Sequence, residues 1–152
     1  MRERIRIASA PFDPEEEMVR FRAQLADAGA VVSFLGLVRA RNAAGAVTAL
    51  SLQHYPGMTE RDIGDALNEA ASRWALEAAL VIHRIGDLAP AEPIVLVATA
   101  SKHRRAAFEA ADFLMDHLKC RALFWKCETG EGGRSWIEPR TDDYADAARW
   151  DG

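Results

Sequence analysis

The sequence has few of the features that mark exported, membrane-spanning or nucleotide-binding proteins. Cysteine occurs only twice in 152 residues, and no apolar leader segment opens the chain, which together favour a reducing, cytoplasmic setting. No apolar run approaches the roughly 20 residues that a membrane-spanning helix needs, so we expect no membrane association. Neither a G-x-G-x-x-G motif nor a Walker loop is present, which argues against a nucleotide cofactor.

Positive charge is also in short supply. The chain has 19 Lys and Arg against 23 Asp and Glu, a net charge of -4, whereas nucleic-acid-binding proteins present a basic face, so we expect no nucleic-acid partner. No cluster of His, Cys, Asp or Glu has the spacing of a metal site, so we expect no metal and no cofactor. Cys120 and Cys127 are interpreted as small buried apolar residues, and His54 and His83 as core histidines.

The spacing of apolar residues predicts one α+β domain at residues 1–140, followed by an acidic C-terminal tail at residues 141–152. Three main helices are expected, and strands come in adjacent pairs between them, which favours a mainly antiparallel sheet. The helices are expected near residues 14–28, 59–74 and 103–119, and the strands near residues 30–38, 50–54, 78–85, 93–100, 122–129 and 136–137.

Some segments carry more particular expectations. Residues 30–38 (AVVSFLGLV) are almost wholly apolar and predict a buried strand, and residues 39–47 contain glycine and asparagine and predict a flexible loop. In the third helix, helical spacing predicts that Phe108 faces the core together with Ala107 and Met115.

Ten residues, Lys119 to Glu128 (KCRALFWKCE), carry the strongest indication of chemistry. Two lysines flank the most aromatic stretch of the chain, and a lysine held near low-dielectric surface either pairs with an anion or gives up its proton. Strand alternation places Lys126 and Glu128 on the same face as Phe124, so Glu128 either pairs with Lys126 or orients it. Lys119 ends the third helix, where a cation also suits the helix dipole.

Further basic residues are candidates for anion binding. Residues 101–105 (SKHRR) lie where a strand gives way to a helix, so free backbone N–H groups add to the side-chain donors of His103 and Arg104. Arg39 directly follows a predicted core strand, and Arg140 follows the last predicted strand. Each of these residues also has an ordinary interpretation as a solvated surface charge.

Six stretches of the sequence are informative when they are taken together. They are GAVVSFLGLVR (29–39), HYPGMT (54–59), VIHRIGDL (81–88), SKHR (101–104), KCRALFWKCE (119–128) and WIE (136–138). Together they resemble the large, catalytic subunit of molybdopterin synthase. The resemblance covers residues 28–140 in unbroken order, so it is far more specific than any single motif.

The resemblance implies a fold of the α/β hammerhead type and a sulfurtransferase activity. Proteins of this family take sulfur from a small ubiquitin-like subunit whose C-terminal Gly-Gly ends in a thiocarboxylate. They transfer two sulfurs to cyclic pyranopterin monophosphate and so build the dithiolene of molybdopterin. The resemblance also implies a homodimer of large subunits at the centre of a heterotetramer, with no cofactor on this chain.

Roles for individual residues also follow from the resemblance. Lys119 and Lys126 are expected to be catalytic and to contact the reactants, Lys119 at the partner's C-terminal carbonyl and Lys126 at the pterin, as a proton donor or an electrostatic clamp. The remaining expected substrate-binding residues are Arg39, His103, Arg104, Glu128 and Arg140. His103 is also a candidate proton shuttle near neutral pH.

Helix length adds a geometric constraint. His103 and Lys119 lie at opposite ends of the predicted third helix, which at 1.5 Å per residue separates them by about 24 Å. A small pterin cannot span that distance. If both residues serve one site, His103 and Arg104 come from a second copy of the chain, which predicts a composite site at a homodimer interface.

Two other functions remain open on the sequence alone. One is a sulfurtransferase that carries a persulfide on Cys120 or Cys127. The other is a non-enzymatic adaptor whose basic groove docks a ubiquitin-like tail or an acidic peptide. A nucleic-acid-binding module is disfavoured by the net charge.

Overall fold

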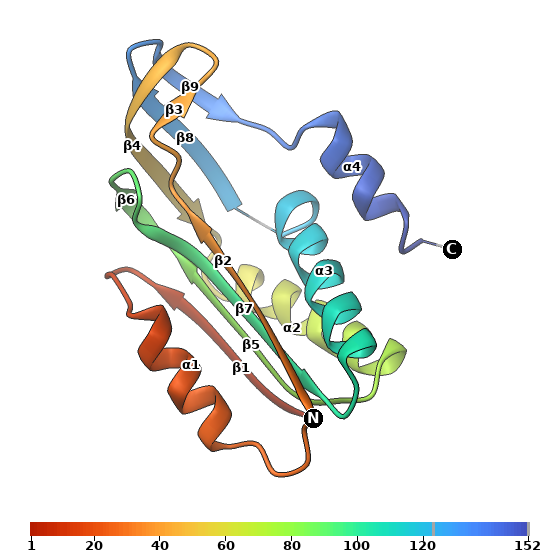
Figure 1. Cartoon of the computed structure of the whole chain (residues 1–152). Helices are drawn as coiled ribbons and strands as arrows, with labels where there is room; N and C mark the ends of the chain where they lie inside the picture. Colours follow the sequence, from red (N-terminus) through yellow and green to blue (C-terminus); the bar gives the residue numbers. More distant parts are fainter. Residues whose placement is uncertain (123, 152) are drawn as a thin grey trace.

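A four-stranded sheet forms the base of the molecule (Figure 1), in the computed structural model that describes residues 1–122 and 124–151. Its strand order is β1-β5-β7-β2, and only β1 and β5 pair in parallel, while the other neighbours are antiparallel. The strands are β1 (Arg2–Ala8), β5 (Leu76–Arg84), β7 (Pro93–Ser101) and β2 (Ala30–Leu37).

Three helices cover the two faces of this sheet. On one face, α1 (Pro14–Ala23) buries Phe21 against apolar residues of β5 and β7 such as Leu80 and Leu96. On the other face, α2 (Met58–Arg73) and α3 (Arg104–Cys120) enclose the larger core. Because α3 is packed against the sheet along its length, the position of its last turn at one end of the sheet is fixed.

A second sheet, of five strands, extends beyond the first one and forms an arm of the molecule (Figure 1). Its strand order is β3-β4-β8-β9, with β6 pairing with β4 off that path. The strands are β3 (Arg41–Asn42), β4 (Gly45–His54), β6 (Gly86–Leu88), β8 (Phe124–Gly130) and β9 (Gly133–Ile137). A fourth helix, α4 (Thr141–Ala148), follows β9 and packs against α3. None of the described helices is long and apolar enough to cross a bilayer.

The predicted fold class is confirmed, because the structure is α+β with mostly antiparallel strands. The three main helices lie close to their expected positions, and His103 caps the third helix rather than opening it. Four elements were not expected, namely β1, β3, β6 and α4. Because α4 lies within residues 141–152, the division into a domain and a tail stays a prediction.

Three local predictions were wrong. The strand at residues 30–37 is not buried, because β2 is the edge of its sheet, and Phe34 and Leu37 are 43% and 49% exposed. Residues 39–47 are not a flexible loop, because β3 pairs with the start of β4 in a tight hairpin. Phe108 does not face the core, since it lies on the open side of α3 and is 60% exposed.

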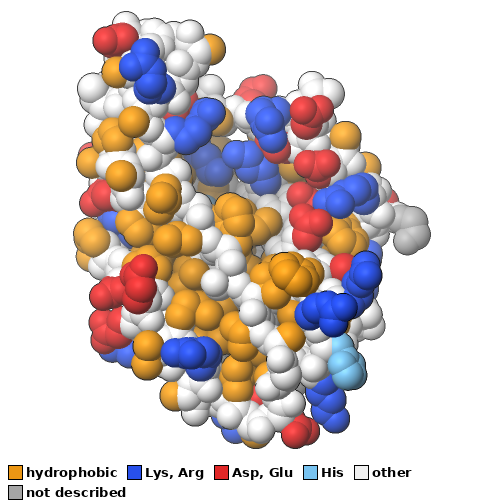
Figure 2. Space-filling model, viewed as in Figure 1, with side chains coloured by type: hydrophobic (Ala, Val, Ile, Leu, Met, Phe, Trp, Pro, Cys, Tyr) orange, Lys and Arg blue, Asp and Glu red, His pale blue; other side chains and the backbone are white. Residues whose placement is uncertain are grey.

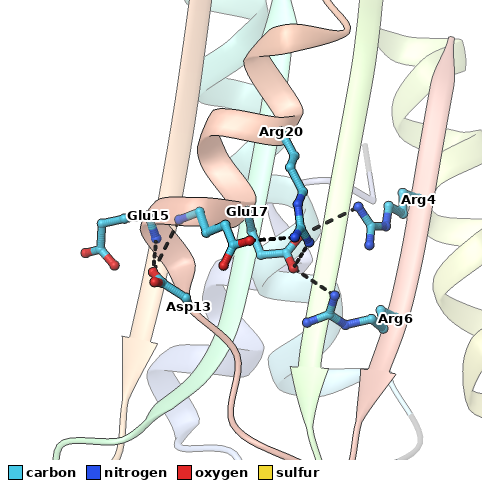
Figure 3. A network of polar contacts seen from close by, with 7 residues as sticks. Arg4, Arg6, Asp13, Glu15, Glu17 and Arg20 are labelled. Atoms are coloured by element: carbon cyan, nitrogen blue, oxygen red, sulfur yellow. Dashed lines mark hydrogen bonds and ion pairs between the residues drawn. The ribbon is translucent and has the colours of Figure 1, made fainter.

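A buried carboxylate anchors α1 to the sheet (Figure 3). Glu17 is 4% exposed, and its Oε1 accepts from Arg6 Nη1 at 2.8 Å and from Arg20 Nη1 at 3.4 Å. Arg4 Nη1 lies 3.6 Å from the other carboxylate oxygen. Because Arg4 and Arg6 belong to β1, this one side chain ties the helix to the outer strand of the sheet.

Replacing Glu17 by alanine should lower the free energy of unfolding by about 1.5–3 kcal/mol, because three arginines lose their shared charged acceptor. Urea denaturation followed by circular dichroism measures the change. The matched control is Glu16→Ala, because Glu16 forms an exposed ion pair with Arg20 alone and should cost less than about 1 kcal/mol. Equal losses in the two variants would contradict the anchoring role of Glu17.

Candidate active site

A cavity of about 460 Å³ lies where the two sheets meet the end of α3. Its walls come from the end of β2 and the residues after it, from the last turns of α3 and from β8. The lining residues are Phe34, Leu35, Gly36, Leu37, Val38, Arg39, Leu50, His83, Ile94, Val95, Met115, Leu118, Lys119, Lys126, Glu128 and Ile137. Most of this lining is apolar, and its described charges are three cations and one carboxylate, a set that favours an anionic ligand.

A second, narrower cavity of about 130 Å³ adjoins the first, since the two share Leu118, Lys119, Lys126 and Ile137. The other described residues that line it are Cys120, Ala122, Phe124, Glu138, Pro139 and Tyr144. Figure 2 shows lysine and arginine side chains gathered in a hollow beside the arm of β8 and β9. Lys119 and Lys126 therefore lie between the two cavities, and each lysine can contact a reactant in either cavity.

The pairing of β8 explains why Lys126 faces the cavities. Along this strand Phe124, Lys126 and Glu128 share one face, while Trp125 points the other way and is 52% exposed. Lys126 is in register with Leu52 of β4 and with Ile137 of β9. A residue hydrogen-bonded between two neighbouring strands has little backbone freedom, so the ammonium is presented from a rigid support.

Lys126 is held in an environment that disfavours its charge. The pKa of Lys126 is lowered from 10.5 to about 8, mainly by burial and also by the positive charge of Lys119, against the opposing effects of Asp143 and Cys120. The electrostatic influence of Lys119 is consistent with the cavities that the two side chains share. At neutral pH most Lys126 side chains are charged, and the ammonium is an unusually good proton donor.

Asp143 of α4 provides a counter-charge for the lysine pair. It is 7% exposed and accepts from the backbone N–H of Arg140 at 2.8 Å and from Arg140 Nη2 at 2.9 Å. Burial raises the pKa of Asp143, but these two hydrogen bonds and the charge of Lys119 outweigh it and hold the pKa below 3.8. The carboxylate is therefore ionised at neutral pH and partly compensates the two lysines.

The structure brings together four of the seven predicted site residues. Arg39, Lys119, Lys126 and Glu128 all line the larger cavity. Glu128 accepts a hydrogen bond from Asn42 Nδ2 at 3.4 Å, and the described residues contain no ion pair between Glu128 and Lys126.

The other three predicted residues lie apart from the described cavities. His103 and Arg104 are at the opposite end of α3 from Lys119, as the length of the helix predicted. Arg140 is the N-cap of α4, and its guanidinium pairs with Asp143 rather than lining either cavity.

His83 was interpreted as a core histidine from the sequence, yet it also lines the larger cavity. It is 2% exposed and stacks on Phe124, with ring centroids 3.8 Å apart and an angle of 16° between the planes. Burial lowers the pKa of His83 to about 3, so the ring is neutral. Alternation along β5 places His83 on the α3 face, but no local pattern indicates its contact with Phe124.

The two cysteines do not form a reactive pair. Cys127 is buried, on the face of β8 opposite Lys126. Cys120 is half-buried, and its pKa is raised by burial and by the carboxylates of Asp143 and Asp116. A raised pKa leaves little thiolate at neutral pH, which makes Cys120 a poor nucleophile. Among the described residues, no group of His, Cys, Asp or Glu could hold a metal ion.

The fold and the site together define an α+β protein with a lysine-based anion site between two adjoining cavities. The chain belongs to the MoaE family, because the family model described as MoaE protein matches residues 7–121. The family predicted from the sequence is thereby confirmed.

Individual relatives agree with this assignment along nearly the whole chain. The molybdopterin synthase catalytic subunit of Pseudomonas aeruginosa is 49% identical over 147 residues, which are 97% of this chain and 98% of that protein. The solved structure of a molybdopterin biosynthesis MoaE protein from Burkholderia ambifaria has a TM-score of 0.83 at 41% identity, covering 100% and 99% of the two chains. The solved structure of molybdopterin synthase from Staphylococcus aureus has a TM-score of 0.77 at 29% identity, and the match covers 88% of this chain and 94% of that chain.

The coupling between the two lysines can be measured directly. In ¹³C-lysine-labelled protein, the Lys126 side chain should titrate near pH 8, and Lys119→Gln should raise that pKa toward 10.5 by removing the neighbouring charge. Because the lowered pKa means that the folded state binds fewer protons than the unfolded state, the contribution of Lys126 to stability should rise between about pH 8 and 10.5.

The control for this measurement is Lys102→Gln, which removes an exposed lysine that pairs with Asp27 at the other end of α3. This substitution should leave the pKa of Lys126 unchanged. A Lys119→Gln protein in which Lys126 still titrates near pH 8 would contradict the electrostatic coupling.

Proposed function

We propose that this chain is the catalytic subunit of a molybdopterin synthase. In this role it transfers sulfur from the C-terminal thiocarboxylate of a small ubiquitin-like subunit to cyclic pyranopterin monophosphate, which forms the molybdopterin dithiolene. The observation that carries the proposal is the pair Lys119 and Lys126, which is shared by two adjoining cavities in a chain of the MoaE family. A reaction between two anions, a thiocarboxylate and a phosphate ester, needs fixed cations at the place where the anions meet.

The two cavities suit two different reactants. The larger one has apolar walls for a flat heterocycle, and Arg39 at its edge can hold a phosphate group. The narrower one suits an extended Gly-Gly tail, because glycine has no side chain to accommodate. With the reactants in these places, the terminal thiocarboxylate reaches the lysines from one side and the pterin from the other.

The two lysines take different roles in the transfer. Lys119 stabilises the oxygen of the thiocarboxylate while its sulfur adds to an oxygen-bearing carbon of the pterin. The C–O bond at that carbon then breaks, and the protonated oxygen leaves. Water then hydrolyses the acyl–sulfur bond, so the sulfur stays on the pterin and the tail returns to a carboxylate. Lys126, with its lowered pKa, donates a proton to the pterin or clamps its developing negative charge. Glu128 lines the same cavity and orients the pterin by accepting a hydrogen bond.

A second copy of the chain is part of this proposal. His103 and Arg104 do not line the cavities of their own subunit, so we place them at the site of a neighbouring copy. The open edge of β2 supports such an interface, because Phe34 and Leu37 remain exposed there and Phe108 is exposed on α3, which packs beside β2. The homodimer is thus the core of a heterotetramer with two small subunits, which we place in the cytoplasm.

Reconstitution with a thiocarboxylated small subunit and cyclic pyranopterin monophosphate tests the proposed reaction. The unmodified chain should produce the dithiolene, and Lys119→Ala or Lys126→Ala should lower the rate by at least about 100-fold, as for the loss of one preorganised charge. Lys102→Ala is the matched control and should retain activity, because Lys102 is exposed and paired with Asp27.

The same assay separates the two competing functions. If the chain were only an adaptor, Lys126→Ala would weaken binding of the small subunit as much as turnover, and calorimetry measures that binding. If the chain carried a persulfide, the double variant Cys120→Ser, Cys127→Ser would be inactive. We expect this double variant to remain active, because neither thiol is an exposed, low-pKa nucleophile.

Mixed dimers test the composite site. A Lys119→Ala chain and a His103→Ala chain should each be inactive alone, since every site in either homodimer lacks one group. A mixed dimer contains one site with both groups intact, so mixing should restore activity up to about half per dimer, if the two sites act independently. Intact mixed dimers without any recovery would show that His103 and Lys119 do not share a site across subunits.

A further inference from the structure

His83 is the one described titratable side chain that lines the larger cavity and has no part in the proposed transfer. It comes from the end of β5, on the wall formed by the main sheet, and its register partner Val95 lines the cavity beside it. Phe124, on which its ring stacks, shares one face of β8 with Lys126. The imidazole therefore lies on the same side of the cavity as the catalytic ammonium.

The hydrogen bonding of His83 fixes its tautomer. Nδ1 lies 2.8 Å from the backbone carbonyl oxygen of Arg84, and a carbonyl oxygen can only accept, so Nδ1 carries the proton. Burial keeps the ring neutral, and the charges of Lys126 and His54 oppose its protonation further. Nε2 therefore carries a lone pair and can act only as an acceptor.

Nε2 is free to bind a ligand. Among the described residues it has no hydrogen-bond partner, whereas the other ring nitrogen has one. The fully enclosed polar atoms without a partner belong to Glu17, Glu60 and Arg84, so Nε2 of His83 is not sealed inside the core. A neutral acceptor that is fixed by a stack and a hydrogen bond, on the wall of an apolar cavity, is built to receive a donor from whatever fills the cavity.

We propose that Nε2 of His83 accepts a hydrogen bond from an N–H or O–H group of the heterocyclic substrate and so orients its ring against Lys126. The proposal rests on the function proposed above, in which a pterin fills the larger cavity. It adds a neutral hydrogen-bond acceptor to a cavity whose cations can only donate hydrogen bonds.

Two substitutions separate the nitrogens of the ring. His83→Asn keeps a donor near the position of Nδ1, which can still reach the Arg84 carbonyl, but it has no atom at the position of Nε2. His83→Gln places an amide oxygen near the position of Nε2. If the proposal is right, His83→Asn should raise KM for the cyclic pterin phosphate about tenfold with little change in kcat. His83→Gln should restore KM to within about threefold of the unmodified chain.

Further variants guard against a purely structural effect. His83→Phe keeps a ring to stack on Phe124 and lacks both nitrogens, so it should raise KM as His83→Asn does. His117→Asn is the matched control, because His117 pairs with Asp62 and lies outside the cavity. Thermal melting checks that each variant is folded, and calorimetry with the cyclic pterin phosphate alone reports binding without turnover.

The outcomes distinguish this inference from the proposed function. In one outcome the unmodified chain converts the substrate, and the folded variants His83→Asn and His83→Phe have the same KM as the unmodified chain. The inference is then wrong and the proposed function stands. If the loss falls on kcat and the titration of Lys126 moves while KM does not, Nε2 serves Lys126 rather than the substrate, which also overturns the inference. If the unmodified chain neither binds nor converts the pterin, the proposed function itself fails.

Discussion

Two ammonium groups held close together at a partly buried junction are the constraint on which the rest of this site depends. Lys119 ends a helix and Lys126 lies in the middle of a strand, and both line the same two cavities. Burial and mutual repulsion both disfavour this arrangement. It persists because neither backbone can move away: α3 is packed against the main sheet, and β8 is paired on both sides.

Nearby carboxylates compensate the positive charges of Lys119 and Lys126 only in part, and this leaves the site able to bind an anion. Asp143 supplies one carboxylate, but its hydrogen bonds go to Arg140 rather than to either lysine. Glu128 lines the cavity without pairing with Lys126 among the described residues. Since neither lysine forms an ion pair among the described residues, an arriving anion relieves an existing repulsion instead of displacing an existing partner. Burial, together with the charge of Lys119, keeps the pKa of Lys126 low enough for proton transfer near neutral pH.

The sequence predicted those parts of the fold and site that depend on local spacing. Alternation along residues 124–128 placed Lys126 and Glu128 on one face, and the length of the third helix placed His103 far from Lys119. Local spacing could not show that β2 lies at a sheet edge, because an apolar run is the same in the sequence whether its strand is central or at the edge. For the same reason Phe108 was assigned to the core, although it is exposed beside that edge.

The part of the site that escaped prediction depends on contacts between distant segments. His83 and Phe124 stack because the ends of β5 and β8 meet, and nothing in either strand alone indicates the partner. The contact matters because it decides the charge of the cavity. A protonated imidazole here would add a third positive charge beside the lysines, whereas burial against Phe124 keeps the ring neutral. Under the proposed function, Arg39 would then bind the phosphate by charge and His83 would bind the heterocycle by hydrogen bonding.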